Sequence, residues 1–275
     1  MTKVVLVGAG GKMGCRITDN LKDSAYEMSY LELSKAGQER LAERGISVAN
    51  QEDVLPAGDI VILAVPDVAI EKVSAQIVPG MKPKALLVTL DPAAALAGKI
   101  YHRDDISVYV SHPAHPSIFN WEPSEEAQRD FFGGILAKQV VVSALMQGTD
   151  ADYDIGDALT KAMYAPVTKN YKITVEQMGL LEPTLVETLC STLQVIVREA
   201  LDIVVEKGVP ADAAKDFLLG HLNIQLAVIY DQIPGAVFSD AANKAIVRGK
   251  PLLIKENWRD VFEPDNVMEQ IMDIT

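Results

Sequence analysis

The sequence predicts an α/β Rossmann-type parallel sheet domain followed by an all-α C-terminal domain. Short apolar runs alternate with segments of helical character through the first half, which is typical of a parallel sheet covered by helices. A glycine-rich turn follows the first apolar run, where a nucleotide-binding sheet places its phosphate-binding turn. The second half instead carries apolar residues at helical spacing over long stretches.

The elements of the first half are predicted from these runs and from the turn residues between them. Each expected strand is a short run rich in apolar residues, and the expected helices lie between such runs. The expected strands are Val4–Val7, Glu27–Leu33, Ile60–Val65, Ala85–Leu90, Ser107–Ser111, Gln139–Ala144 and the extended segment Pro166–Thr174. The expected helices are Lys12–Leu21, Ala36–Arg44, Val68–Ile77 and Asp150–Met163.

The second half is predicted to be helical. Val175–Lys207 has almost no turn residues besides Pro183, so one long helix, kinked or started at that proline, is the simplest account. Gly208–Pro210 ends it, a second helix follows, and short helices are expected within Pro234–Thr275. We therefore expect an NAD-binding domain over residues 1–174 and a helical substrate and dimerisation domain over residues 175–275.

Length, charge and cysteine content exclude several classes of function. The 275 residues include 38 acidic and 25 basic side chains, a formal net charge of −13. Nucleic acids and anionic membranes require clustered basic residues, so we expect neither as a partner. No apolar run approaches the roughly 20 residues that span a bilayer, and no targeting segment is recognised. With two widely separated cysteines, Cys15 and Cys190, the protein is expected to be cytoplasmic with free thiols.

The glycine-rich turn is the first candidate site. Glycines allow a tight turn and a close approach to a pyrophosphate, which the N-terminus of the following helix stabilises. The usual G-x-G-x-x-G spacing is not kept, because Met13 stands at its sixth position, but Gly8, Gly11 and Gly14 fit a G-x-x-G-x-x-G variant. The residues expected to bind the cofactor here are Gly8, Gly10, Gly11, Lys12, Met13 and Gly14.

Acidic residues at the ends of later strands extend this cofactor site. Glu32 lies where a carboxylate would bind a ribose hydroxyl and repel a 2′-phosphate, so NAD is favoured over NADP. Pro66 and Asp67 follow the strand Ile60–Val65 at the sheet edge where ligands bind. Asp91 ends the next strand in the same manner, and there a helix N-cap and a functional role are equally open.

Two histidines form the second candidate site. His112 and His115 each precede a proline and follow the strand Ser107–Val110, so both are expected at the carboxyl edge of the sheet. Histidine is the commonest proton shuttle and metal ligand, and the prolines stiffen this loop. The pattern therefore predicts catalysis or metal binding.

The helical half contributes two further candidates. Glu182 has apolar neighbours, and a carboxylate there is costly unless it is paired or coordinates a metal. His221 interrupts the apolar segment Phe217–Ile229, where a satisfied core histidine and a functional one remain open alternatives.

With these motifs in view, the chain resembles the D-apionate oxidoisomerase family, which carries a 6-phosphogluconate-dehydrogenase-like C-terminal domain. The resemblance spans essentially the full length and includes several motifs that are not general features of nucleotide-binding folds. Its residues are 8–14, 62–67, 112–116, 142–148, 174–178, 216–221 and 238–241.

The resemblance implies an NAD-dependent oxidation of a small anionic sugar acid, coupled to migration of a hydroxymethyl group as in an α-ketol rearrangement. Ketol-acid reductoisomerases perform related migrations with a divalent metal. The groups implied for this chemistry are His112, His115, Glu182 and His221. Our hypothesis is that His115 and Glu182 share a divalent metal, Zn or Mg, while His112 or His221 relays the proton.

Two other functions are possible from the sequence: a plain dehydrogenase and a non-catalytic NAD-binding module. A dehydrogenase that acts without rearrangement usually carries Lys-x-x-x-Asn on the first helix after the nucleotide domain, and the stretch Glu176–Glu187 has no lysine. A non-catalytic NAD-binding module is disfavoured by the histidine pair and Glu182. An apolar stripe at helical spacing is open to two interpretations, a face toward the core or a face toward a second subunit, so a homodimer is a hypothesis. The stripe includes Val186, Leu193, Val197 and Leu201.

Overall fold

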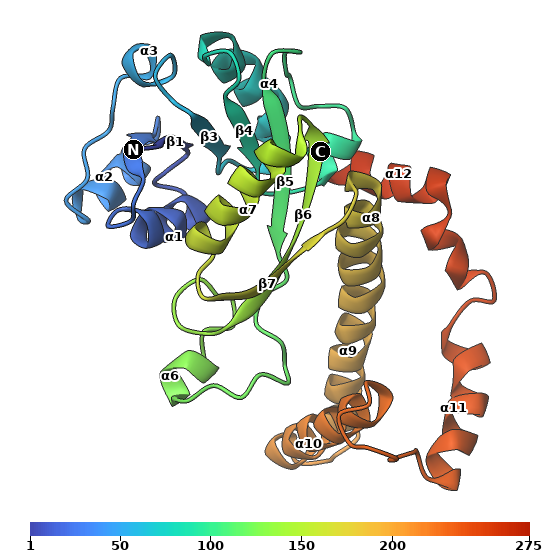
Figure 1. Ribbon diagram of the computed structural model, residues 1–275. Helices are drawn as coiled ribbons and strands as arrows, with labels where there is room; N and C mark the ends of the chain where they lie inside the picture. The colour runs from blue at the N-terminus through green and yellow to red at the C-terminus, as the bar shows by residue number, and fades with distance from the viewer. The chain divides into compact units, whose positions relative to one another are not determined.

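Seven strands form one sheet in the order β2-β1-β3-β4-β5-β6-β7 in a computed structural model that describes residues 1–275 (Figure 1). The strands from β2 to β5 in this order pair in parallel, β6 pairs antiparallel with β5, and β7 pairs parallel with β6. The strands are β1 (Lys3–Val7), β2 (Glu27–Leu31), β3 (Ile60–Leu63), β4 (Leu86–Thr89), β5 (Ser107–Pro113), β6 (Gln139–Gln147) and β7 (Val167–Lys172).

Helices connect these strands, which confirms the predicted Rossmann-type domain. Two of them, α1 and α7, have the bounds predicted from the sequence. Thr149 begins α7 with a capping box in which its hydroxyl accepts from Asp152 N and the Asp152 side chain accepts from Thr149 N. The helices are α1 (Lys12–Leu21), α2 (Lys35–Ala42), α3 (Gln51–Val54), α4 (Asp67–Ile77), α5 (Ala93–Leu96), α6 (Glu125–Gln128), α7 (Asp150–Met163) and α8 (Val175–Gly179), with a 3-10 turn at Val78–Gly80.

Apolar side chains fill both faces of the sheet. All four residues of β3 are buried, as expected for a parallel strand with helices on each side. Successive residues alternate between the two cores: Val61 and Leu63 belong to one, Ile60 and Ile62 to the other. Because both faces are closed over the central strands β3 and β4, ligands can reach these strands only at their ends.

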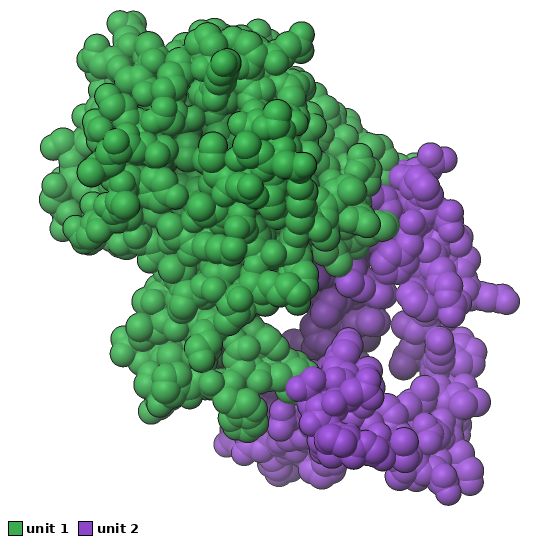
Figure 2. Space-filling model, viewed as in Figure 1, with its two compact units in different colours: residues 1–183, 268–275 green, residues 184–267 purple.

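The chain divides into two compact units that differ from the predicted domains (Figure 2). Unit 1 contains Met1–Pro183 and Met268–Thr275, and unit 2 contains Thr184–Val267. The sequence placed the boundary near Thr174, but Met178 in α8 is buried in one of the two sheet cores. The start of the predicted helical domain therefore packs with the sheet and belongs to unit 1.

The predicted long helix consists of three segments. Between α8 and α9 (Thr192–Glu206) lies a π-helical segment, Leu180–Ser191, that contains Pro183. Proline has no backbone N–H and its ring clashes with the carbonyl four residues earlier, so ordinary α-helical hydrogen bonding is interrupted there. The remaining helices are α10 (Ala211–Ile229), α11 (Asp240–Leu253), a 3-10 helix (Trp258–Phe262) and α12 (Pro264–Ile274). None of the helices has the length and apolar character needed to cross a bilayer.

Candidate functional site

The glycine turn joins β1 to α1 with very close backbone contacts. Gly8 has a φ of 76°, and a Cβ atom there would lie 2.5 Å from the Ala64 carbonyl oxygen. A Cβ atom on Gly14 would lie 2.1 Å from the Gly8 carbonyl oxygen. Any side chain at either position would push the turn away from its neighbours. The turn therefore keeps a bare backbone at the N-terminus of α1, as a pyrophosphate-binding turn requires.

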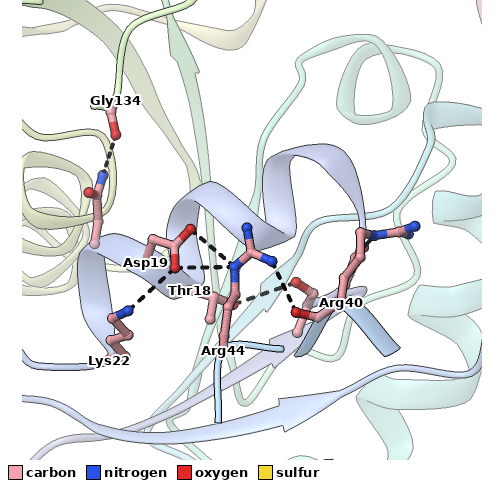
Figure 3. Close-up of polar contacts among 9 residues, drawn as sticks. Thr18, Asp19, Lys22, Arg40, Arg44 and Gly134 are labelled. Atoms are coloured by element: carbon pink, nitrogen blue, oxygen red, sulfur yellow. Dashed lines mark hydrogen bonds and ion pairs between the residues drawn. The ribbon is translucent and has the colours of Figure 1, made fainter. Parts of the chain in front are cut away.

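Arg40 of α2 and Arg44, just after the end of this helix, hold this region in place. The Nε atom of Arg40 donates to the Gly10 carbonyl oxygen at 2.7 Å. One turn later, Arg44 donates through Nε to the Asp19 carboxylate on α1 at 3.1 and 3.2 Å (Figure 3). These contacts tie the two helices that follow β1 and β2, so the turn between β1 and α1 has a fixed position.

Glu32 follows β2 and is oriented by three donors. Its Oε2 accepts from Gly10 N at 3.0 Å, and its Oε1 accepts from both N and Oγ of Ser34 at 2.8 Å. A Cβ atom on Gly37 would lie 2.4 Å from the Glu32 side chain, so a glycine is needed there for the carboxylate to occupy this place.

A cavity of about 260 Å³ adjoins this carboxylate at the carboxyl ends of β1 and β2. Apolar side chains form most of its wall, and Glu32 supplies a charged acceptor. This combination fits the adenosine half of a dinucleotide, with the base against apolar groups and ribose hydroxyls toward Glu32. Its wall includes Val7, Gly8, Leu31, Val48, Asn50 and Ile77.

A second polar centre lies at the carboxyl ends of β3, β4 and β5. One ligating atom from each of Asp91, His112 and Glu182 lies within 4.8 Å of the other two, and all three residues are partly buried. His112 Nδ1 lies 3.0 Å from the Leu90 carbonyl oxygen. Since a carbonyl only accepts, Nδ1 carries the proton, and His112 Nε2 faces Glu182 Oε2 at 3.3 Å.

Asp91 both caps a helix and faces this centre. Its Oδ1 accepts from Ala93 N at 2.7 Å at the start of α5, while its Oδ2 lies 3.6 Å from His112 Nδ1. Burial raises the pKa of Asp91. Both roles left open by the sequence are therefore compatible with its geometry.

The Asp67 carboxyl group interacts electrostatically with Asp91. Burial, followed by repulsion from the Asp91 carboxylate, raises the pKa of Asp67 to about 6. Two acidic groups with raised pKa values beside a histidine are typical of sites that move protons. This carboxyl group, expected to bind cofactor, thus also borders the polar centre.

The structure does not bring together the residues predicted to share a metal. Glu182 lies in the centre, but His115 is exposed and its Nδ1 donates to the Phe132 carbonyl oxygen at 2.9 Å. The prediction that His115 pairs with Glu182 is corrected: His112 and Asp91 are the neighbours of Glu182. The reason is that β5 continues through Pro113, so His112 is a residue of the strand itself. His115 lies beyond the end of the strand, where its φ of 60° turns the backbone.

His221 lies in unit 2, whereas Asp91, His112 and Glu182 belong to unit 1. Its Nδ1 donates to the Phe217 carbonyl oxygen at 2.8 Å, and its ring stacks on the Phe217 ring with centroids 4.1 Å apart. Asp91 is the member of the centre that sequence reasoning did not select. Its signal was the same as that of Asp67, an acidic residue directly after a buried strand.

Comparisons with known proteins agree with this architecture. Residues 120–275 match the family model "Phosphogluconate dehydrogenase (decarboxylating) C-term", and residues 1–120 match "Acetohydroxy acid isomeroreductase, NADPH-binding domain". The chain is 51% identical to a D-apionate oxidoisomerase of Cupriavidus necator, over 99% of each chain. It is 48% identical to a D-apionate oxidoisomerase of Rhizobium rhizogenes, over 100% of each.

The fold of the chain also matches that of a solved structure. It is a semialdehyde dehydrogenase NAD-binding protein from Cupriavidus necator in complex with calcium and NAD. The two chains match with a TM-score of 0.98 and 50% sequence identity, and each is covered completely.

Proposed function

This chain belongs to the D-apionate oxidoisomerase family, and we propose on that basis that it catalyses the NAD-dependent oxidative isomerisation of D-apionate to 3-oxo-isoapionate. The observation that carries the proposal is the likeness to two D-apionate oxidoisomerases over nearly the whole length of each chain. The glycine turn, Glu32 and the adjoining cavity fit the required dinucleotide. The polar centre at the neighbouring strand ends supplies the acid and base groups.

The reaction has an oxidation and a migration. The secondary alcohol next to the carboxylate loses a proton and a hydride and becomes a ketone. The neighbouring tertiary alcohol then loses its proton, and a hydroxymethyl group moves with its bonding electrons from that carbon to the ketone carbon. The tertiary alcohol carbon becomes the new ketone, and the old ketone oxygen takes up a proton. Bound NAD supplies the hydride acceptor.

His112 is the group best placed to accept the hydroxyl protons. Its Nδ1 proton is held by the Leu90 carbonyl oxygen, which leaves the Nε2 lone pair free to act as a base. Glu182 faces this atom and stabilises the imidazolium that forms when a proton arrives. Burial raises the pKa of Asp67 to about 6, so this group can hold a proton near neutral pH and return it to the product oxygen.

We further propose that the carboxylates of Asp91 and Glu182 hold a divalent cation beside His112. One oxygen of each lies within 4.8 Å of the other and of a His112 ring nitrogen, so two negative charges meet at this partly buried centre. Carboxylate oxygens completed by water suit magnesium and manganese, and zinc also accepts them, while His112 Nε2 stays free to act as the base. Such a cation would act as a Lewis acid on the ketone oxygen.

The decisive experiment is incubation of the full-length protein with NAD and D-apionate, following NADH absorbance and identifying the product by NMR. The proposal expects NADH and a rearranged keto acid in equal amounts. An unrearranged or decarboxylated product would instead identify a plain dehydrogenase, the alternative that the phosphogluconate dehydrogenase model over residues 120–275 favours. Metal analysis before and after exhaustive chelation tests the cation separately, since full activity without metal would overturn that part alone.

A further inference from the structure

The first turns of α1 carry positive charge that no carboxylate neutralises. Lys12 and Arg16 lie four residues apart on α1, so their side chains share one face of the helix. The first turn has no acidic residue, and neither cation takes part in an ion pair, although the chain has a net charge of −13. Two like charges near the positive end of a helix dipole destabilise the helix. The arrangement is therefore suited to receiving an anion.

One aromatic ring holds both of these cations. The Lys12 Nζ atom lies 4.5 Å from the centroid of the Phe132 ring, and the Arg16 Cζ atom lies 4.7 Å from the same centroid. The face of an aromatic ring attracts cations at this distance. Phe132 is 49% exposed, so burial in a core does not account for its place. The ring orders two long side chains that would otherwise be mobile.

The segment that carries Phe132 belongs to the connection between β5 and β6 and is fixed by its own hydrogen bonds. The Asp130 carboxylate accepts from the backbone N–H groups of four residues that follow it. Hydrogen bonds to a charged acceptor are roughly twice as strong as those between neutral groups. Phe132 therefore lies in a stiff turn. The four donors are Gly133, Ile135, Leu136 and Ala137.

Further contacts attach this turn to α1 and to the residues after β5. Arg16 Nη1 donates to the Gly133 carbonyl oxygen at 3.4 Å, and Asn20 Nδ2 donates to the Gly134 carbonyl oxygen at 3.1 Å. From the other side, His115 Nδ1 donates to the Phe132 carbonyl oxygen at 2.9 Å. The position of the Phe132 ring over α1 is thus determined on both sides.

This position matters because Lys12 is the first residue of α1, where the pyrophosphate of a dinucleotide binds. A mobile lysine side chain loses rotamer freedom when it becomes fixed on an anion, and this loss weakens binding. A ring that already holds the ammonium group removes much of the loss before the cofactor arrives. The second cation, Arg16, adds its charge at the same ring.

We propose that Phe132 is a positioning residue for the cofactor: its ring holds the Lys12 and Arg16 cations ready for the pyrophosphate of NAD. This inference rests on the proposed function, because it takes NAD as the cofactor. Phe132 acts through the two cations and not on the reacting atoms. Its replacement should therefore change the affinity for the cofactor and leave kcat at saturating NAD unchanged.

Fluorescence titration of the full-length protein with NADH is the first test. Phe132→Leu keeps an apolar side chain but removes the ring, and the Kd for NADH should rise about 2- to 5-fold, as expected for the loss of an exposed cation–π contact. Phe132→Tyr keeps the ring and should bind NADH as the wild type does. Phe131→Leu is the matched control, since the exposed Phe131 ring holds no cation. An unchanged Kd for Phe132→Leu would overturn the inference.

A mutant cycle separates positioning from a structural role. Lys12→Met and Arg16→Met together remove both cations through which Phe132 is proposed to act. In that background, adding Phe132→Leu should not change the Kd for NADH any further. A further rise equal to that seen in the wild-type background would show that the ring acts without the cations, which contradicts the proposal.

Competition against NADH identifies the part of the cofactor that is concerned. Phe132→Leu should weaken binding of ADP, which has a pyrophosphate, by the same factor as NADH, and should leave binding of adenosine unchanged. Equal weakening of ADP and adenosine would overturn the inference. If the wild-type protein bound no NADH, the proposed function would fail together with the inference. Normal NADH binding by both the wild type and Phe132→Leu would remove the inference alone.

Discussion

The Nε2 atom of His112 lies 3.3 Å from the Oε2 atom of Glu182, across the carboxyl edge of the sheet. The pair joins a strand residue to the π-helical segment that follows α8. The proton on His112 Nδ1 is fixed by the Leu90 carbonyl oxygen, so only Nε2 can exchange a proton with a ligand or with Glu182. The chemistry of the centre therefore depends on one nitrogen atom.

Replacing this histidine should stop catalysis without preventing cofactor binding. His112→Gln removes the base, and loss of a positioned general base typically lowers kcat by about 10²- to 10⁴-fold. NADH affinity, measured by fluorescence titration, should stay near the wild-type value, because the glycine turn and Glu32 are untouched. His102→Gln is the matched control, since His102 Nδ1 binds the Ile100 carbonyl oxygen outside this centre. Equal activity of the two variants would contradict the assigned role.

Asp91→Asn should weaken binding of a divalent cation. An asparagine oxygen can still accept from Ala93 N and cap α5, so the local fold is retained while the negative charge is lost. Loss of a direct ligand should lower affinity by more than the roughly 10- to 100-fold that loss of an outer-shell partner costs. Isothermal titration with zinc or manganese measures this change. Unaltered affinity would place the cation elsewhere.

The stability of the cofactor-free protein should depend on Asp67 between about pH 4 and pH 6. Burial raises the pKa of Asp67 from 3.8 to about 6, so in this range the folded protein binds a proton that the unfolded chain releases. The free energy of unfolding should therefore fall as pH rises through this range. At pH values above the range it should stay at the lower value. Asp67→Asn should be more stable than the wild type at pH 7, by about 1 kcal/mol after allowing for solvent screening, and equal to it near pH 4.

Asp59→Asn supplies a control of opposite sign. The Lys82 ammonium group and the Lys3 N–H hold the pKa of Asp59 below its usual range. This carboxylate stabilises the fold above its unfolded pKa, and the stabilisation is lost as pH falls through the lowered folded value. Urea unfolding at a series of pH values should thus give differences from the wild type with opposite signs for the two variants. Differences of the same sign for both variants would refute the opposite pKa shifts assigned to Asp67 and Asp59.

Glu32→Gln should relax the preference for NAD. The carboxylate accepts from Gly10 N and from Ser34, and a 2′-phosphate beside it would be repelled. Removing the charge should lower kcat/KM for NAD by about 10-fold, as expected for the loss of a charged hydrogen bond, and raise it for NADP. Glu39→Gln makes the same change in net charge on the exposed side of α2. In this variant the ratio of kcat/KM for NAD to kcat/KM for NADP should equal the wild-type ratio.

The sequence predicted the sheet domain well because its elements are specified locally. The helices Lys12–Leu21 and Asp150–Met163 have their predicted bounds, since a turn or cap residue begins each one. His112 and Glu182 were both selected, because a histidine at a sheet edge and a carboxylate among apolar residues are unusual in themselves. Their pairing could not be derived, since it depends on where the segment after α8 packs.

What the sequence could not supply was the tertiary packing of α8 and the turn after β5. Met178 is buried in unit 1, so the division falls nine residues after the predicted Thr174. The strand β5 extends through Pro113, which leaves His112 in the strand and moves His115 away from the centre. Both differences arise from contacts between residues far apart in the sequence, which local patterns do not report.

The last eight residues, Met268–Thr275, belong to unit 1 although residues 184–267 separate them from the rest of it. Ile271 is buried beside Gly179, and Lys99 Nζ donates to Thr275 Oγ1 at 3.2 Å. During synthesis on the ribosome, the nucleotide-binding unit is therefore first to emerge and last to be completed, because its final helix leaves after all of unit 2. Removal of Met268–Thr275 would therefore act on the sheet domain and not on unit 2.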